Sequence, residues 1–170
     1  MKARAGRVVL GIDPGIASTG IGVVLDRDRT YRALHFELIR TKVGTPFPDR
    51  LAILHRRVAG LVREHRPDSM AMERLFFSNN AKTAIAVGQA QGAILLAFAG
   101  TGIPISEYTP VQVKQAVTGD GRAEKPAVGD MIRRLLGLAE VPKPDDVADA
   151  LAVAYCHLVS TRPGMDGRRG

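Results

Sequence analysis

Residues 7–26 read RVVLGIDPGIASTGIGVVLD, which is two apolar runs joined by a turn. The first run, at residues 7–13, is rich in Val, Leu and Ile and predicts a buried strand, and residues 20–26 predict its hairpin partner. Asp13 is the last residue of the first run, and a Pro-Gly pair follows it directly. An unpaired carboxylate is costly to desolvate at the end of a buried strand. Asp13 therefore either starts the turn or belongs to a functional site.

Strands and helices alternate along the rest of the chain. Apolar runs predict further strands at residues 31–41, 69–74 and 103–108. The spacing of apolar residues predicts helices at residues 49–66 and 79–99, a third after Pro110, and two more toward the C-terminus. This order predicts an α/β fold in which a mixed sheet is flanked by helices.

Length and charge indicate one domain with a polyanionic partner. The chain has 170 residues, 45% of them hydrophobic, which is enough for one core of ordinary size. Its 24 Lys and Arg residues outnumber 17 Asp and Glu, and the formal charge of +7 favours nucleic acid first and an anionic membrane surface second. We expect residues 1–160 to form the folded domain and residues 161–170 a disordered basic tail.

No segment is typical of secretion or membrane insertion. The apolar run after the basic N-terminus is broken at Gly11 and Asp13, which is too early for a signal peptide. Residues 84–99 are the most apolar later segment, but they are shorter than the roughly 20 residues that span a bilayer. The single Cys156 permits no intrachain disulfide and no cysteine-rich metal site. These features predict a cytoplasmic protein without a membrane partner.

Four acidic residues are candidates for chemistry. Asp13 ends the first predicted strand, Glu73 ends the fourth, and Asp146 and Asp149 share one face of the last predicted helix. Carboxylates without His or Cys favour a hard divalent ion such as Mg²⁺ or Mn²⁺. Two such ions, roughly 3.5–4 Å apart, support phosphodiester hydrolysis. The four histidines lack the spacing of metal ligands and are assigned no role.

Each acid also has a purely structural interpretation. Asp13 could start the turn, Glu73 could pair with an arginine, and Asp145 or Asp146 could cap the last helix. We assign capping to Asp145. The neighbouring Arg74 either contacts a nucleic-acid backbone or pairs with an acid. Because only a fold brings distant residues together, the sequence leaves open whether the other four acids converge.

Four segments resemble those of RuvC-type Holliday junction resolvases, which belong to the RNase H-like superfamily. In the family's order and spacing they are VLGIDPGIASTGIGVV, MERLFFSNNAKTAIAVGQAQGAI, YTPVQVKQAVTGDGRAEK and DDVADALAVA. The resemblance runs from about residue 7 to residue 159. It implies a five-stranded mixed β-sheet flanked by α-helices, with the first and fourth strands adjacent and the last helix beside their ends. It also implies that Asp13, Glu73, Asp146 and Asp149 are catalytic and hold two Mg²⁺ ions, for which Mn²⁺ could substitute.

The resemblance implies an activity and partners. It suggests a Mg²⁺-dependent crossover junction endodeoxyribonuclease that resolves four-way DNA junctions by two symmetric nicks on opposing strands, in homologous recombination and DNA repair. A homodimer suits this task because it places two active sites symmetrically on a nearly two-fold junction. The face of Gly88 and Gly92 is the candidate dimer interface, and packing of that face inside the monomer is the alternative. The branch-migration proteins RuvA and RuvB are the further implied partners.

The resemblance also suggests which residues contact DNA. Phe76 resembles an aromatic residue at the junction centre, where stacking on an unpaired base is worth about 1–3 kcal/mol. Phe77 either does the same or belongs to the core. Lys114 and Lys125 match basic residues near the scissile phosphate, and Arg122 lies in the glycine-containing loop between them as a candidate backbone contact.

Three other functions are weighed against this one. The motif DPGIASTG also resembles the phosphate-binding turn of the actin, Hsp70 and sugar-kinase group, but those proteins enclose a nucleotide between two such domains. The YqgF-like branch of the same superfamily acts on RNA, and the RuvC-like segments after Glu73 disfavour it. A non-catalytic basic DNA-binding module is disfavoured because four acids would repel phosphate unless a metal intervened.

Overall fold

The computed structural model describes residues 6–74 and 81–162. Its strands are β1 Arg7–Asp13, β2 Ser18–Arg27, β3 Thr30–Arg40, β4 Ser69–Glu73 and β5 Ile105–Tyr108. Its helices are α1 Phe47–His65, α2 Ala81–Phe98, α3 Pro110–Thr118, α4 Lys125–Leu135 and α5 Asp145–Ser160. Helix α1 begins two residues earlier than the predicted start because Pro48 is accepted in a first turn, where the missing N–H has no helical partner.

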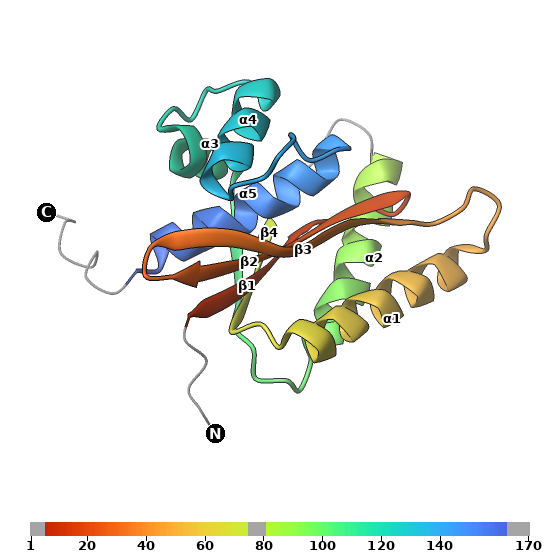
Figure 1. Cartoon of the computed structure of the whole chain (residues 1–170). Coiled ribbons are helices and arrows are strands. Elements are labelled where there is room, and N and C mark those ends of the chain that lie inside the picture. The colour runs from red at the N-terminus through yellow and green to blue at the C-terminus, as the bar shows by residue number, and fades with distance from the viewer. Residues whose placement is uncertain (1–5, 75–80, 163–170) are drawn as a thin grey trace, which may run out of the picture.

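The five strands form one mixed sheet in the order β3-β2-β1-β4-β5. Strands β1, β2 and β3 form an antiparallel meander, whereas β4 runs parallel to β1, and β5 runs parallel to β4. Helices α1 and α2 cover one face, and α5 lies on the other with α3 and α4 beyond it (Figure 1). The predicted fold class and the adjacency of the first and fourth strands are confirmed.

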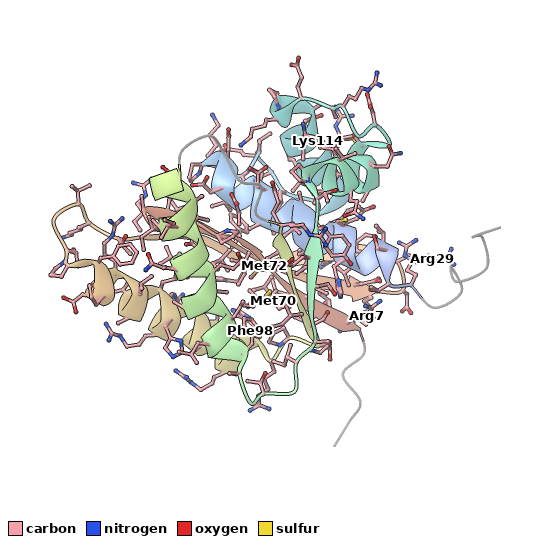
Figure 2. The ribbon with its side chains drawn as sticks, turned by 180° about the vertical axis from the view of Figure 1, so that it is seen from behind. Arg7, Arg29, Met70, Met72, Phe98 and Lys114 are labelled. Carbon is pink, nitrogen blue, oxygen red and sulfur yellow. The ribbon has the colours of Figure 1, made fainter. Side chains whose placement is uncertain are left out.

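Each face of the sheet has its own apolar core. On one face, Leu10 and Ile12 of β1 pack with side chains of α1 and α2. Figure 2 shows Met70 and Met72 of β4 beside Phe98 of α2 in this core. On the opposite face the core is built around α5, in which every residue from Ala150 to Leu158 is buried. Burial of that whole segment fixes α5 firmly against the sheet.

Glycines let α5 approach the sheet directly. A Cβ built on Gly20 of β2 would clash with the backbone oxygen of Asp146, and one on Gly11 of β1 would clash with that of Ala150. Only glycine permits this backbone-to-backbone contact. The consequence is that the first turns of α5 lie beside the end of β1.

The start of α5 corrects one prediction. The sequence predicts Asp145 as the capping residue, but Asp145 is the first helical residue, and Pro144 occupies the N-cap position. Among the described residues, no side chain donates or accepts a capping hydrogen bond there. The capping prediction is therefore wrong, because Asp145 lies one position too far along the chain. Its carboxylate still lies in the first turn, where the helix dipole favours negative charge.

The outer face of α2 is apolar and exposed. Ile85 and Leu96 are each 63% exposed, and Gly88 and Gly92 lie between them on the same helical stripe. No described atom lies within 4 Å of a Cβ built on either glycine. The alternative that this face packs inside the monomer is therefore wrong for the described chain. No helix in the described ranges combines the length and apolarity that crossing a membrane demands.

Candidate active site

The topology brings the acidic residues to one edge of the sheet. Strands β1 and β4 are parallel neighbours with Ile12 opposite Met72, so their last residues, Asp13 and Glu73, end side by side. Because α5 starts at this edge, Asp146 and Asp149 in its first two turns reach the same place.

Electrostatics show that these carboxylates interact. Burial, reinforced by the charges of Asp149, Glu73 and Asp146, raises the pKa of Asp13 to about 7. Burial also raises the pKa of Glu73, with Asp149 adding to it and Lys125 and Lys114 opposing it. The pKa of Asp149 is raised by burial against the opposing effect of Lys125. Raised pKa values mean that negative charge on these carboxylates is unfavourable unless it is compensated. A bound cation would supply that compensation.

Two of the carboxylates have specific partners. Lys125, the first residue of α4, donates from Nζ to Oδ2 of Asp149 at 3.1 Å, and this contact raises the pKa of Lys125. Ser18, the first residue of β2, donates from Oγ to Oδ2 of Asp146 at 2.7 Å. Sequence reasoning missed Ser18, because the residue it contacts lies 128 positions further along the chain.

The candidate DNA contacts have different outcomes. Lys114 lies on α3, labelled in Figure 2, near enough to Glu73 for its charge to influence that carboxylate. Arg122 is exposed in the loop between α3 and α4, where its backbone N–H donates to Asp120. Phe76 and Phe77 lie outside the described residues, as do residues 163–170 of the predicted tail, so those predictions stay predictions.

Arg74 lies beside the carboxylates but pairs with an acid. Its Nε lies 3.7 Å from Oε2 of Glu107, a residue of β5. The other carboxylate oxygen of Glu107 accepts a hydrogen bond from Nε2 of Gln91 at 3.0 Å. Of the two interpretations of Arg74, pairing with an acid is thus the one that the described residues support.

The donor chemistry of the cluster fits a hard divalent ion. All four side chains are carboxylates, which are the ligands that Mg²⁺ and Mn²⁺ prefer. As the side chains stand, no three His, Cys, Asp or Glu residues in the described ranges converge closely enough to hold one ion. Asp149 is held by Lys125, whereas the Ser18 hydroxyl engages one oxygen of Asp146. Binding an ion therefore requires the Asp149 side chain to leave Lys125.

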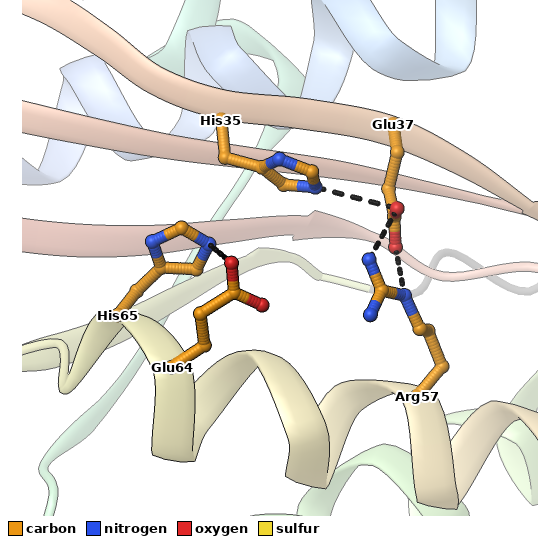
Figure 3. Close-up of polar contacts among 5 residues, drawn as sticks. All are labelled: His35, Glu37, Arg57, Glu64 and His65. Atoms are coloured by element: carbon orange, nitrogen blue, oxygen red, sulfur yellow. Dashed lines mark hydrogen bonds and ion pairs between the residues drawn. The ribbon is translucent and has the colours of Figure 1, made fainter.

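Two of the histidines lie in a polar cluster between β3 and α1. His35 of β3 and His65 of α1 stack with their ring centroids 5.2 Å apart (Figure 3). Glu37 lies 3.3 Å from His35 and accepts two hydrogen bonds from the Arg57 guanidinium, at 2.6 and 2.7 Å. This cluster joins β3 to α1.

A mixed five-stranded sheet in this order, with acids at the ends of β1 and β4 and on the last helix, defines a protein of the RNase H-like class. A family model described as crossover junction endodeoxyribonuclease RuvC matches residues 9–157. The chain belongs to this RuvC family.

Individual relatives agree with that assignment. The crossover junction endodeoxyribonuclease RuvC of Moorella thermoacetica is 55% identical over 150 residues, which cover 88% of this chain and 90% of that one. A structure of Thermus thermophilus RuvC matches with a TM-score of 0.82 at 42% identity, over 89% of this chain and 93% of that chain. T. thermophilus RuvC in complex with Holliday junction substrate matches with a TM-score of 0.82 at 41% identity, over 89% and 92% of the two chains.

Proposed function

We propose that this chain is a crossover junction endodeoxyribonuclease, which resolves four-way DNA junctions by two symmetric nicks on opposing strands in recombination and repair. The observation that carries the proposal is the meeting of β1, β4 and the start of α5 at one edge of the sheet, where burial, together with the charges of the other three acids, raises the pKa of Asp13 to about 7. Family membership supplies the reaction class, and the formal charge of +7 suits a DNA substrate.

The proposed reaction depends on Mg²⁺, with Mn²⁺ as a substitute, and uses two ions per site. Asp13, Glu73, Asp146 and Asp149 would hold them. When bound, such ions activate a water and stabilise the leaving oxygen of a phosphodiester. The carboxylates would hold that positive charge at the edge of the sheet, where Asp13 is largely buried.

Lysines beside the carboxylates would neutralise the substrate. Lys125 is paired with Asp149 in the free protein. Lys125 has to leave that carboxylate before Asp149 can hold an ion and Lys125 can contact a phosphate. Its side chain is 63% exposed and flexible, so an approaching phosphate can draw it away. Lys114 and Arg122 would contact the DNA backbone from α3 and the loop after it. Phe76 stays the proposed stacking residue at the junction centre.

The active protein is proposed to be a homodimer. The exposed stripe of α2 that includes Ile85, Gly88, Gly92 and Leu96 is the proposed interface, since small residues let a second helix approach closely and the flanking side chains would bury apolar surface. Action in the cytoplasm together with RuvA and RuvB rests on the resemblance alone.

The proposal is tested with an end-labelled four-way junction and a linear duplex of matching sequence. We expect Mg²⁺-dependent nicking of the junction and no nicking of the duplex, with all cleavage lost in EDTA. A four-way junction made of RNA serves as a second control. Tight junction binding without nicks in either Mg²⁺ or Mn²⁺ would identify a binding module instead, and a preference for RNA would favour the YqgF-like activity.

A further inference from the structure

We infer that Ser18 is a positioning residue for the nuclease site, and that its hydroxyl orients the Asp146 carboxylate for cation binding. The inference rests on the proposed function, because it concerns how one proposed metal ligand is held. The Ser18 hydroxyl donates to Oδ2 of Asp146 at 2.7 Å, a length typical of strong hydrogen bonds to carboxylates.

The backbones on both sides fix this contact. Ser18 is the first residue of β2 and pairs with Arg40 of β3 in the sheet. Two residues later, Gly20 lies against the backbone of Asp146, so β2 and α5 cannot shift easily relative to each other. A serine side chain has a single rotatable bond to its oxygen, and it therefore adds little freedom to an already rigid frame.

The turn before Ser18 is also held in place. The Thr19 hydroxyl donates to the backbone oxygen of Gly15 at 2.6 Å, and the backbone N–H of Thr41 donates to Ala17 at 3.1 Å. The first bond closes the turn that follows Asp13, and the second ties that turn to the residue directly after β3. Ser18 thus connects the turn that carries one carboxylate to the helix that carries another.

The contact differs in kind from the one made by Lys125. Lys125 brings a positive charge to Asp149 and competes with a cation for that carboxylate. The Ser18 hydroxyl is neutral and engages Oδ2 of Asp146, and no hydrogen bond to Oδ1 is found among the described residues. Hydrogen bonds that orient a ligating carboxylate in this way typically affect metal affinity by 10–100-fold.

The test compares Ser18→Thr with Ser18→Val, which have nearly the same shape but differ in the hydroxyl, and includes Ser18→Ala. Mn²⁺ alone is titrated into each protein without DNA, and free Mn²⁺ is measured by electron paramagnetic resonance. We expect Mn²⁺ affinity to fall about tenfold in the valine and alanine variants and to be retained in the threonine variant. The Mg²⁺ concentration for half-maximal junction nicking should rise in parallel, while junction binding in EDTA stays unchanged.

Ser69 provides a matched control. It is the first residue of β4 and is 5% exposed, and its hydroxyl has no hydrogen-bond partner in the described ranges. Ser69→Ala should therefore bind Mn²⁺ like the unmodified protein. Equal Mn²⁺ affinity in the Ser18→Val and Ser18→Thr proteins would overturn the role of Ser18. An unmodified protein that neither binds Mn²⁺ nor nicks a junction would instead overturn the proposed function, and the inference with it.

Discussion

At the scale of single residues, burial among like charges explains the chemistry of Asp13. Its pKa of about 7 means that the metal-free folded protein holds a proton there which an unfolded chain, with a pKa near 3.8, releases. Below pH 3.8 both states are protonated and the residue costs no stability. As pH rises toward 7, the unfolded state ionises first, and folding becomes progressively less favourable.

This predicts how Asp13→Asn changes stability in EDTA. The amide does not titrate, so the free energy of unfolding of the variant does not carry this penalty. The advantage of the variant over the unmodified protein should therefore be larger at pH 8 than at pH 5, by on the order of 2 kcal/mol, since one pKa unit corresponds to about 1.4 kcal/mol. Chemical denaturation at both pH values measures the gain. If the difference in unfolding free energy between the two proteins is the same at pH 5 and at pH 8, the raised pKa of Asp13 is contradicted.

The sequence predicted some residues of the site and missed others for physical reasons. Asp13 and Glu73 are predictable as candidates because strand ends are visible as breaks in apolar runs, and Asp146 and Asp149 because helical spacing places them on one face. Ser18 was missed because its contact depends on tertiary structure. Asp145 was misassigned because a helix start is uncertain by a residue or two in any sequence pattern.

At the scale of elements, the contact between α5 and the sheet determines whether the site forms. The strands and helices themselves were predictable from periodicity and from proline positions. The close approach of α5 was not, because a glycine in a strand is equally consistent with a bulge or a weak strand position. The one register shift between the described parts of β2 and β3 lies between Val23 and Val24, not at a glycine.

Substitution of Gly20 tests this contact. Gly20→Ala should destabilise the protein by about 1–3 kcal/mol, as overpacking does, and should reduce junction nicking because α5 is displaced. Gly60→Ala is the control, since Gly60 lies within α1 and its added Cβ would meet only the far end of Arg63. The control should be neutral or stabilising by up to about 1 kcal/mol. Equal stability of the two variants in thermal unfolding would argue against the close packing of α5.

At the scale of the whole molecule, the exposed apolar stripe of α2 makes a dimer the expected state. The composition predicts a basic protein with one core. The resemblance to RuvC-type resolvases indicates which helix would form a dimer interface. A single chain could not reveal whether that helix face was free. The exposure of Ile85 and Leu96 removes the monomer-packing alternative for the described residues.

We expect the unmodified protein to sediment as the proposed dimer and Leu96→Glu as a monomer, because the substitution places a charge in the proposed apolar interface. Sedimentation velocity measures the change, and Mn²⁺ binding should persist because the carboxylates lie at the edge of the sheet. Val43→Glu is the control, since Val43 is 97% exposed in the loop before α1 and should leave the dimer intact. If Leu96→Glu stays dimeric, the interface lies elsewhere.

The most direct test of the central claim is to map the nicks on a mobile four-way junction labelled on each strand in turn. The unmodified protein with Mg²⁺ should cut two opposing strands at symmetry-related positions. Asp13→Asn should bind the same junction but nick it roughly 100-fold more slowly or worse, as expected when one group that stabilises developing charge is lost. Unpaired nicks, or full activity of Asp13→Asn, would contradict a symmetric resolvase built on this carboxylate cluster.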